Sequence, residues 1–181
     1  MNRRRILLAA AWLAAVPLAQ SQTVLPQGSE IVFVTRQMGV PVEGRFTQWQ
    51  AELQFDPKAP AAGKVAFSID TGSARFGAAE TEAEVRKPEW FHVARFPQAS
   101  FRSGAIRATG PDRYQVSGRL TIKGQSQDIV VPVALDGATA TGSFTIRRLA
   151  FRIGDGEWAD TSMVADDVQV RFKLQLAGLK P

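Results

Sequence analysis

The residues of this chain whose types could support chemistry gather in one short stretch, KPEWFHVARFPQASF, at positions 87–101. It contains His92, the only histidine of the sequence. A hydrolytic triad needs a general base beside its nucleophile, so a triad here would have to use His92. No Gly-x-Ser-x-Gly motif accompanies it. Four aromatic residues surround the imidazole: Trp90, Phe91, Phe96 and Phe101. The stretch predicts either a site built on one imidazole or an apolar surface that binds a hydrophobic ligand.

Other kinds of catalytic site find little support. The chain has no cysteine, which excludes disulfides, cysteine nucleophiles and thiolate-bound metals. Its densest acidic cluster lacks the spacing of a calcium-binding loop and is interpreted as a solvated loop. The cluster consists of Asp155, Glu157, Asp160, Asp166 and Asp167. Gly154-x-Gly156 is too short for a phosphate-binding loop. We therefore expect no metal, no cofactor and no enzymatic activity.

Aromatic residues outside the stretch extend the apolar pattern. They are Phe76, Phe144, Phe151 and Trp158. Such rings either fill an ordinary core or line a cavity. A cavity needs no catalytic residue, because each buried methylene contributes about 0.8 kcal/mol. A tail of about ten to fifteen carbons would contribute at most roughly 8–12 kcal/mol before ordering costs, whereas micromolar binding needs about 8 kcal/mol.

The first 21 residues have the pattern of a secretory signal peptide. Arg3, Arg4 and Arg5 precede the apolar run 6–16, and Ala19-Gln20-Ser21 supplies small residues for cleavage. The alternative, a membrane anchor, needs about 20 apolar residues, more than the run provides. We expect cleavage after Ser21, or else after Ala19. Residues 22–181 would then form one domain with no stable membrane insertion.

The charge of that domain is close to neutral. Of the 22 basic residues of the chain, three lie in residues 1–21, which contain no acidic residue; 19 basic residues then remain against 17 acidic ones. A near-neutral domain is a poor candidate for binding nucleic acid. Without disulfides, it must be held together by its core.

Strict alternation of apolar and polar residues dominates the chain after Ser29, which is typical of half-buried β-strands. For example, Val168, Val170, Phe172, Leu174 and Leu176 alternate with polar residues. Eight strands are predicted, at 30–38, 44–56, 63–70, 95–108, 113–123, 126–135, 141–152 and 166–177. Only 78–92 has a helical pattern.

Turn residues separate the predicted strands, and Lys123-Gly124 suggests a tight hairpin. Eight antiparallel strands close naturally into a barrel, which removes exposed edges. A two-sheet sandwich is the alternative. An eight-stranded barrel either is filled by its own side chains or holds one small ligand.

Several short motifs occur in an order and spacing that resemble one protein family. They are Val42-x-Gly44-x-Phe46, Phe55-Asp56-Pro57, Ile69-Asp70, Arg95-Phe96-Pro97, Tyr114-x-Val116-x-Gly118-x-Leu120-Thr121-Ile122-Lys123-Gly124, Phe144-Thr145-Ile146-x-Arg148, Phe151-x-Ile153-Gly154 and Val164-x-Asp166-x-Val168. With them, residues 29–177 resemble the YceI-like, polyisoprenoid-binding family.

The resemblance implies an all-β fold: an extended, lipocalin-like antiparallel barrel of eight strands with one short helix. It further implies an elongated apolar cavity for an isoprenoid or fatty chain, and a bacterial periplasmic location. A homodimer is consistent with it. The sequence departs from the family pattern in the predicted helix and at Arg36-Gln37-Met38-Gly39, where a histidine is common.

We thus expect a periplasmic protein that binds a lipid, such as a quinone tail, a prenyl precursor, or a fatty amide or acid. The residues expected to line the cavity are Phe33, Phe46, Leu53, Phe55, Phe67, Phe91, Phe96, Phe101, Phe144 and Trp158. Head-group contacts are expected from Arg36, Arg148 and His92. The alternative function is a filled barrel that docks a protein partner through exposed aromatic residues. An enzyme that uses His92 is the third hypothesis.

Overall fold

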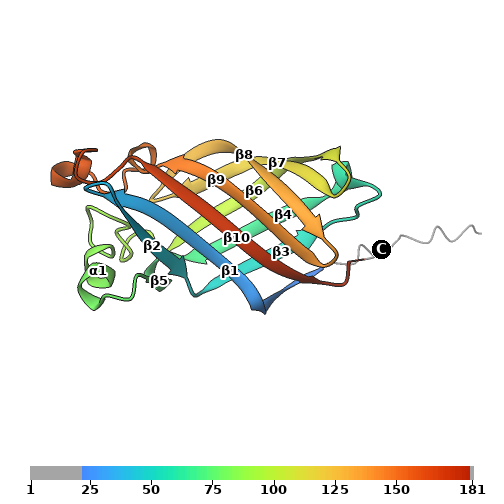
Figure 1. Cartoon of the computed structure of the whole chain (residues 1–181), viewed down its shortest axis with the longest axis horizontal. Coiled ribbons are helices and arrows are strands. Elements are labelled where there is room, and N and C mark those ends of the chain that lie inside the picture. Colours follow the sequence, from blue (N-terminus) through green and yellow to red (C-terminus); the bar gives the residue numbers. More distant parts are fainter. Residues whose placement is uncertain (1–21, 180–181) are drawn as a thin grey trace, which may run out of the picture.

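The computed structural model describes residues 22–179, which form one curled antiparallel sheet of ten strands (Figure 1). The strands are β1 Thr23–Gln37, β2 Val40–Phe46, β3 Trp49–Gln54, β4 Lys64–Asp70, β5 Ala74–Arg75, β6 Gln98–Gly110, β7 Arg113–Ile122, β8 Gln125–Asp136, β9 Thr139–Arg147 and β10 Asp167–Ala177. Their order across the sheet is β3-β4-β6-β7-β8-β9-β10-β1-β2-β5. The predicted signal peptide lies outside the described residues.

The sheet curls far enough to bring β3, the strand at one end of the order, beside the start of β1. Just before β1, Gln22 forms an isolated bridge with Leu53 of β3, and the Gln22 amide donates to the Leu53 carbonyl at 2.9 Å. The Gln22 side-chain oxygen also accepts from the amide of Phe55 at 2.7 Å. The prediction of a barrel is confirmed, and the two-sheet sandwich is not observed because all ten strands belong to one sheet.

The predicted count of eight strands was too low by two. The predicted strand 44–56 is two strands, since Thr47 and Gln48 leave the ladder between β2 and β3. β2 pairs with β1, whereas β3 pairs with β4. The break explains why Phe46 is out of phase with Trp49. The two-residue β5, which pairs with the end of β2, is too short to produce an alternation pattern.

Boundaries at the ends of other strands also differ from the prediction. β1 begins at Thr23, seven residues before the predicted start, with a register shift between Leu25 and Glu30 where it pairs with β10. β9 ends at Arg147, and a 3₁₀ turn, η3 Arg148–Phe151, follows. The predicted helix 78–92 contains only six helical residues, α1 Ala79–Glu84. Lys123 and Gly124 form the predicted tight hairpin, both with positive φ.

The connections at one end of the barrel contain α1, η3 and the 3₁₀ turn η4 Gly156–Ala159 (Figure 1, left). Two further 3₁₀ turns are η1 Pro60–Ala62 and η2 Thr71–Ser73. No helix in residues 22–179 is long and apolar enough to cross a membrane.

Candidate functional site

Two adjoining chambers occupy the inside of the barrel. The larger one, here called the mouth chamber, has a volume of about 530 Å³ and includes Met38, Glu80, Thr81, Glu84 and Met163 in its wall. The smaller one, the deep chamber, has a volume of about 160 Å³ and lies among strand residues such as Leu53 and Leu174. Five residues line both chambers and form a waist between them: Ile31, Ile69, Leu120, Phe144 and Val170. The barrel interior is therefore not filled by its own side chains.

The deep chamber is apolar throughout. Every residue in its wall is aliphatic or aromatic, and the only hydroxyl among them belongs to Tyr114. Tyr114 is buried, and its burial together with the charge of Asp112 raises the pKa of the phenol. An apolar cavity of roughly 150 Å³ can stay dry and hold a benzene molecule. The deep chamber thus has space for about six carbon atoms of a hydrocarbon.

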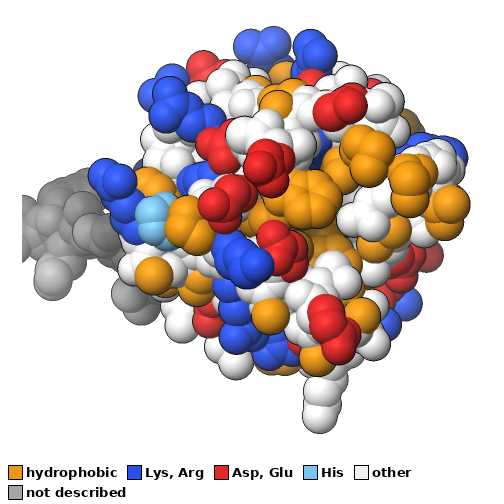
Figure 2. Space-filling model, turned by 90° about the vertical axis from the view of Figure 1, so that its left-hand side faces the viewer, with side chains coloured by type: hydrophobic (Ala, Val, Ile, Leu, Met, Phe, Trp, Pro, Cys, Tyr) orange, Lys and Arg blue, Asp and Glu red, His pale blue; other side chains and the backbone are white. Residues whose placement is uncertain are grey.

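The mouth chamber opens at the α1 end of the barrel. Exposed Met38, Glu80 and Met163 belong to its wall, whereas Ile146 and Trp90 in the same wall are buried. Figure 2 shows this end of the molecule, where hydrophobic side chains lie exposed at the centre with acidic side chains beside them. At the packing of the benzene cavity, the mouth chamber has space for on the order of twenty carbon atoms.

Aromatic rings form a connected wall of the mouth chamber. The Phe33 ring lies 5.0 Å from Phe46 and 5.3 Å from Phe76, centroid to centroid. Trp90 and Trp158 are 5.5 Å apart. Cross-strand pairing positions the Phe33 ring, because Phe33 of β1 is paired with Gly44 of β2, and the absence of a side chain on Gly44 leaves room for the ring.

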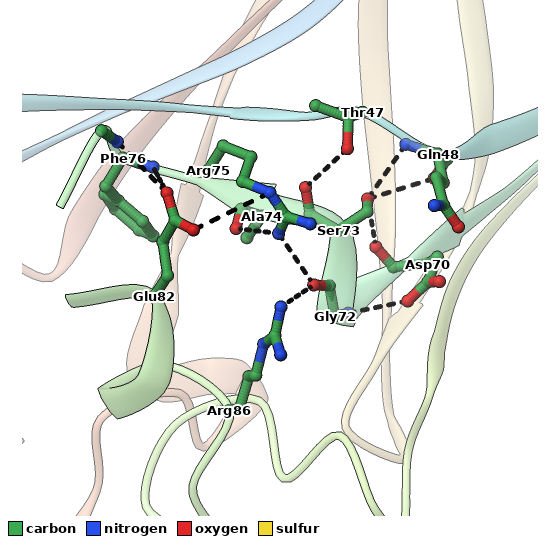
Figure 3. A network of polar contacts seen from close by, with 11 residues as sticks. Thr47, Gln48, Asp70, Gly72, Ser73, Ala74, Arg75, Phe76, Glu82 and Arg86 are labelled. Atoms are coloured by element: carbon green, nitrogen blue, oxygen red, sulfur yellow. Dashed lines mark hydrogen bonds and ion pairs between the residues drawn. The ribbon is translucent and has the colours of Figure 1, made fainter. Parts of the chain in front are cut away.

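A polar network fixes the segment that leads into α1 (Figure 3). One carboxylate oxygen of Glu82 accepts from the amides of Phe76 at 3.0 Å and Gly77 at 3.3 Å, and the other lies 3.8 Å from Nε of Arg75. Arg86 and Arg75 both donate to the carbonyl of Gly72, at 2.9 and 3.1 Å. α1 is therefore tied to β5 and the residues after it through Glu82, and to η2 through Arg86 just past its C-terminal end, and this determines which of its side chains line the mouth chamber.

On the side facing β5, the same network holds the break between β2 and β3. The hydroxyl of Ser73 donates to the carbonyl of Asp70 at 2.7 Å and accepts from the amide of Gln48 at 3.1 Å. The carboxylate of Asp70 accepts from the amide of Gly72 at 2.8 Å. These contacts explain a role for Asp70 in the fold that involves no ligand.

Arg148 is buried in the mouth chamber wall, with 1% of its surface exposed. All five of its N–H groups donate to backbone carbonyls. Nε donates to Ala165, Nη1 to Ile153 and Gly154, and Nη2 to Trp158 and Val164. Burial lowers the pKa of this guanidinium, which remains charged. Arg148 thus organises the loop after β9, and no N–H group is left for the head-group contact that we expected.

Most of the residues expected to line a cavity do so. Leu53, Phe55, Phe67 and Phe101 line the deep chamber; Phe33, Phe46, Phe91 and Trp158 line the mouth chamber; Phe144 lines both. Phe96, His92 and Arg36 are not among the residues that line either chamber. The Phe96 ring lies against Gly124 and 5.8 Å from the His92 ring, while Arg36 donates to the carbonyl of Gly39 at 3.2 Å. The stretch 87–101 therefore divides between the chamber wall and the outside of the barrel.

Sequence reasoning missed two groups of lining residues. It concentrated on aromatic residues and passed over the aliphatic ones, such as Ile31, Ile69 and Val170, although their alternation in the strands was visible. It also treated Glu80 and Glu84 only as signals of a helix. They are spaced one helical turn apart, and both line the mouth chamber.

The acidic cluster at 155–167 is dispersed among structural contacts. Asp155 lies 3.7 Å from Nζ of the buried Lys123, and Asp166 accepts from Nε of Arg147 at 2.8 Å and from the amide of Leu149 at 3.0 Å. Asp160 accepts from the amide of Ser162 at 2.8 Å. Within residues 22–179, no three histidine, aspartate or glutamate side chains come close enough together to hold a metal ion.

Solved structures of the same fold come from several bacteria. The chain aligns with BcnA of Burkholderia cenocepacia at 42% identity and a TM-score of 0.80, over 85% of this chain and 99% of BcnA. A polyisoprenoid binding domain from Saccharophagus degradans aligns at 18% identity and a TM-score of 0.65, over 86% of this chain and 97% of that domain. The latter similarity shows the fold alone.

Sequence relatives have lower coverage. Protein YceI of Salmonella arizonae is 34% identical over 94 residues, which are 52% of this chain and 49% of the relative. A UPF0312 protein of Pseudomonas savastanoi is 30% identical over 96 residues, which are 53% of this chain and 50% of the relative. The alignments thus span about half the length of these curated relatives. The sequence profile of the YceI-like domain, in contrast, matches residues 22–176, nearly all of the described part. The chain therefore belongs to the YceI-like family.

Proposed function

We propose that this protein binds one amphipathic lipid and shields its hydrocarbon tail from water inside the barrel. The observation that carries the proposal is the pair of adjoining chambers inside the barrel, of about 530 and 160 Å³, which share five apolar lining residues. Ligand sites typically occupy about 300–1,000 Å³. A largely apolar space of this size is unfavourable to fill with water and favourable to fill with a tail.

Isoprenoid and fatty chains both meet these requirements. Their bulk is apolar, and the five residues that line both chambers are all aliphatic or aromatic. The Saccharophagus degradans domain of the same fold is described as polyisoprenoid-binding. For this chain, the proposal rests on its own chambers. The proposed ligands are molecules with a long apolar tail and a small head group.

The chambers favour this hypothesis over a filled barrel that docks a protein partner. His92, the one histidine of the chain, is not among the residues that line either chamber, so the chambers offer no imidazole for catalysis. We therefore propose a binding protein rather than an enzyme.

Organic extraction of the purified protein followed by mass spectrometry tests the proposal. We expect close to one lipid molecule per barrel. Val168→Trp, which places an indole in the mouth chamber, should reduce the lipid content several-fold. Val130→Trp is the matched control, because Val130 is exposed on β8. Two results together would contradict the proposal: the purified wild-type protein contains no lipid, and a fatty alcohol added to it does not bind.

We further propose that residues 22–181 act in the periplasm after removal of residues 1–21. The mass of the protein recovered from a periplasmic extract tests this. It should correspond to a chain that begins at Gln22, or else at Gln20. An intact N-terminus on protein found only in the cytoplasm would contradict it.

A further inference from the structure

The charged groups in the mouth chamber wall differ in whether they can contact a ligand. Two are carboxylates, Glu80 and Glu84, and one is the guanidinium of Arg148. The guanidinium is surrounded by five carbonyl oxygens, which use all its N–H groups and offset its charge. An anionic head group would thus meet carboxylates but find no cationic donor among the lining residues that the structure describes.

The two carboxylates are held in place by the fold. They occupy positions i and i+4 of α1, so their side chains lie on one face of the helix. Glu82 lies between them in sequence, and its carboxylate accepts hydrogen bonds from the backbone amides of Phe76 and Gly77. Like charges at this spacing repel each other, which a cation placed between them would relieve.

Neighbouring cations leave part of this negative charge unpaired. Glu84 forms an ion pair with the exposed Lys87, at 2.5 Å. For Glu80, which is exposed, the structure of residues 22–179 records no ion pair. The entrance therefore has at least one carboxylate available to a charged ligand.

Aromatic rings add a second, independent preference for a cation. Phe76 and Phe91 line the same chamber as the two carboxylates, whereas the Trp90 ring already has the guanidinium carbon of Arg148 6.0 Å from its centroid. The face of an aromatic ring attracts ammonium groups, and aromatic walls combined with carboxylates are suited to quaternary ammonium ligands. The tail of such a ligand would extend past these rings toward the waist.

We propose that the mouth chamber selects amphiphiles with an organic cation as head group, the ammonium lying beside Glu80 and Glu84 and the tail in the chambers. The proposal rests on the proposed function and narrows its ligand class. It predicts that, for a given tail, an ammonium head binds better than an uncharged head, and that a carboxylate head binds worst.

Three probes that share a twelve-carbon tail test this by calorimetry on lipid-depleted protein: dodecyltrimethylammonium and dodecanoate, each below its micellar concentration, and dodecanol below its solubility limit. We expect the ammonium probe to bind about tenfold more tightly than dodecanoate at low salt, and the ratio to fall as salt is raised. Glu80→Gln combined with Glu84→Gln should remove most of the ratio. Glu52→Gln, on the outside of β3, should leave it unchanged.

The outcomes separate the two proposals. If dodecanol binds but the ammonium and carboxylate probes bind equally, or the double variant keeps the wild-type ratio, the cation proposal is wrong and the lipid-binding proposal stands. If none of the three probes binds, both are wrong. Glu80→Lys combined with Glu84→Lys provides a further check, because it should reverse the order and favour dodecanoate.

Discussion

The ring of Phe33 lies directly over Gly44, its cross-strand partner on β2. A Cβ atom on Gly44 would lie 2.4 Å from Cζ and 2.6 Å from Cε2 of that ring. Glycine is thus required at this position by the close approach of a side chain. The pairing lets the Phe33 ring lie flat enough to contact Phe46 and Phe76 and to form part of the mouth chamber wall.

Gly44→Ala is therefore expected to destabilise the fold by about 1–3 kcal/mol, because the ring or the strand has to move. Denaturant unfolding measures the loss. Gly104→Ala is the matched control, since the nearest atom to a Cβ on Gly104 is 3.9 Å away. Equal stability of the two variants would mean that the Phe33 ring is not confined by Gly44.

Arg148 offers a second prediction about stability. Replacing it by methionine leaves five backbone carbonyls without their donor, and each buried acceptor left unsatisfied costs about 1–3 kcal/mol. We expect Arg148→Met to lose about 3 kcal/mol or more, and Arg148→Lys to recover only part of it, because lysine has three donors instead of five. The control is its neighbour, Arg147→Met. Arg147 is exposed and forms a surface ion pair with Asp166, so its loss should cost less than about 1 kcal/mol.

The strands of this protein could be predicted because alternation is a local signal. In β10, for instance, Val170, Phe172, Leu174 and Leu176 all line the deep chamber, as the alternation predicted. The break at Thr47 and Gln48 was missed because its cause is not local. Contacts with Ser73, about 25 residues away, hold those two residues out of the ladder.

The candidate site was predicted less completely than the fold, for a related reason. A residue type indicates whether a side chain prefers burial, and the aromatic residues were identified on that basis. It does not indicate which donors are already used. The side chain of Arg148 is of a type that could bind a lipid head group. Its five hydrogen-bond partners, however, are backbone carbonyls within residues 153–165, which only the folded loop brings together.

The third prediction concerns Tyr114, the only tyrosine in the chain, so that a tyrosinate absorbance titration reports on it alone. Burial, with the charge of Asp112, raises its pKa above the ordinary value of 10.0. In the unfolded chain the phenol loses its proton near pH 10, whereas the folded protein retains it to higher pH. The stability that Tyr114 contributes is thus fully present below about pH 10 and falls as the pH rises through the folded pKa.

Two measurements check this. The absorbance midpoint of the folded protein should lie above that of the unfolded protein. In Tyr114→Phe, the free energy of unfolding should fall less at alkaline pH than in the wild-type protein, because the phenol that ionises is absent. A folded midpoint at or below the unfolded one would show that the phenol is hydrated.

The last prediction concerns the waist between the two chambers. Val170 lines both chambers and is paired in register with Phe33 on one side and Phe144 on the other. A phenylalanine in its place should close the passage while leaving the mouth chamber open. For a series of primary alcohols, each added methylene should tighten binding to the wild-type protein by up to about fourfold, until the deep chamber is full.

In Val170→Phe, the gain with tail length should end about six carbons earlier, because the deep chamber has space for about that many. Short alcohols, which stay in the mouth chamber, should bind both proteins similarly. Val130→Phe places the same ring on the exposed outside of β8 and should behave as the wild-type protein. If Val170→Phe keeps the full length dependence, the end of the tail does not reach the deep chamber. The hydrocarbon would then have to be accommodated by the mouth chamber alone.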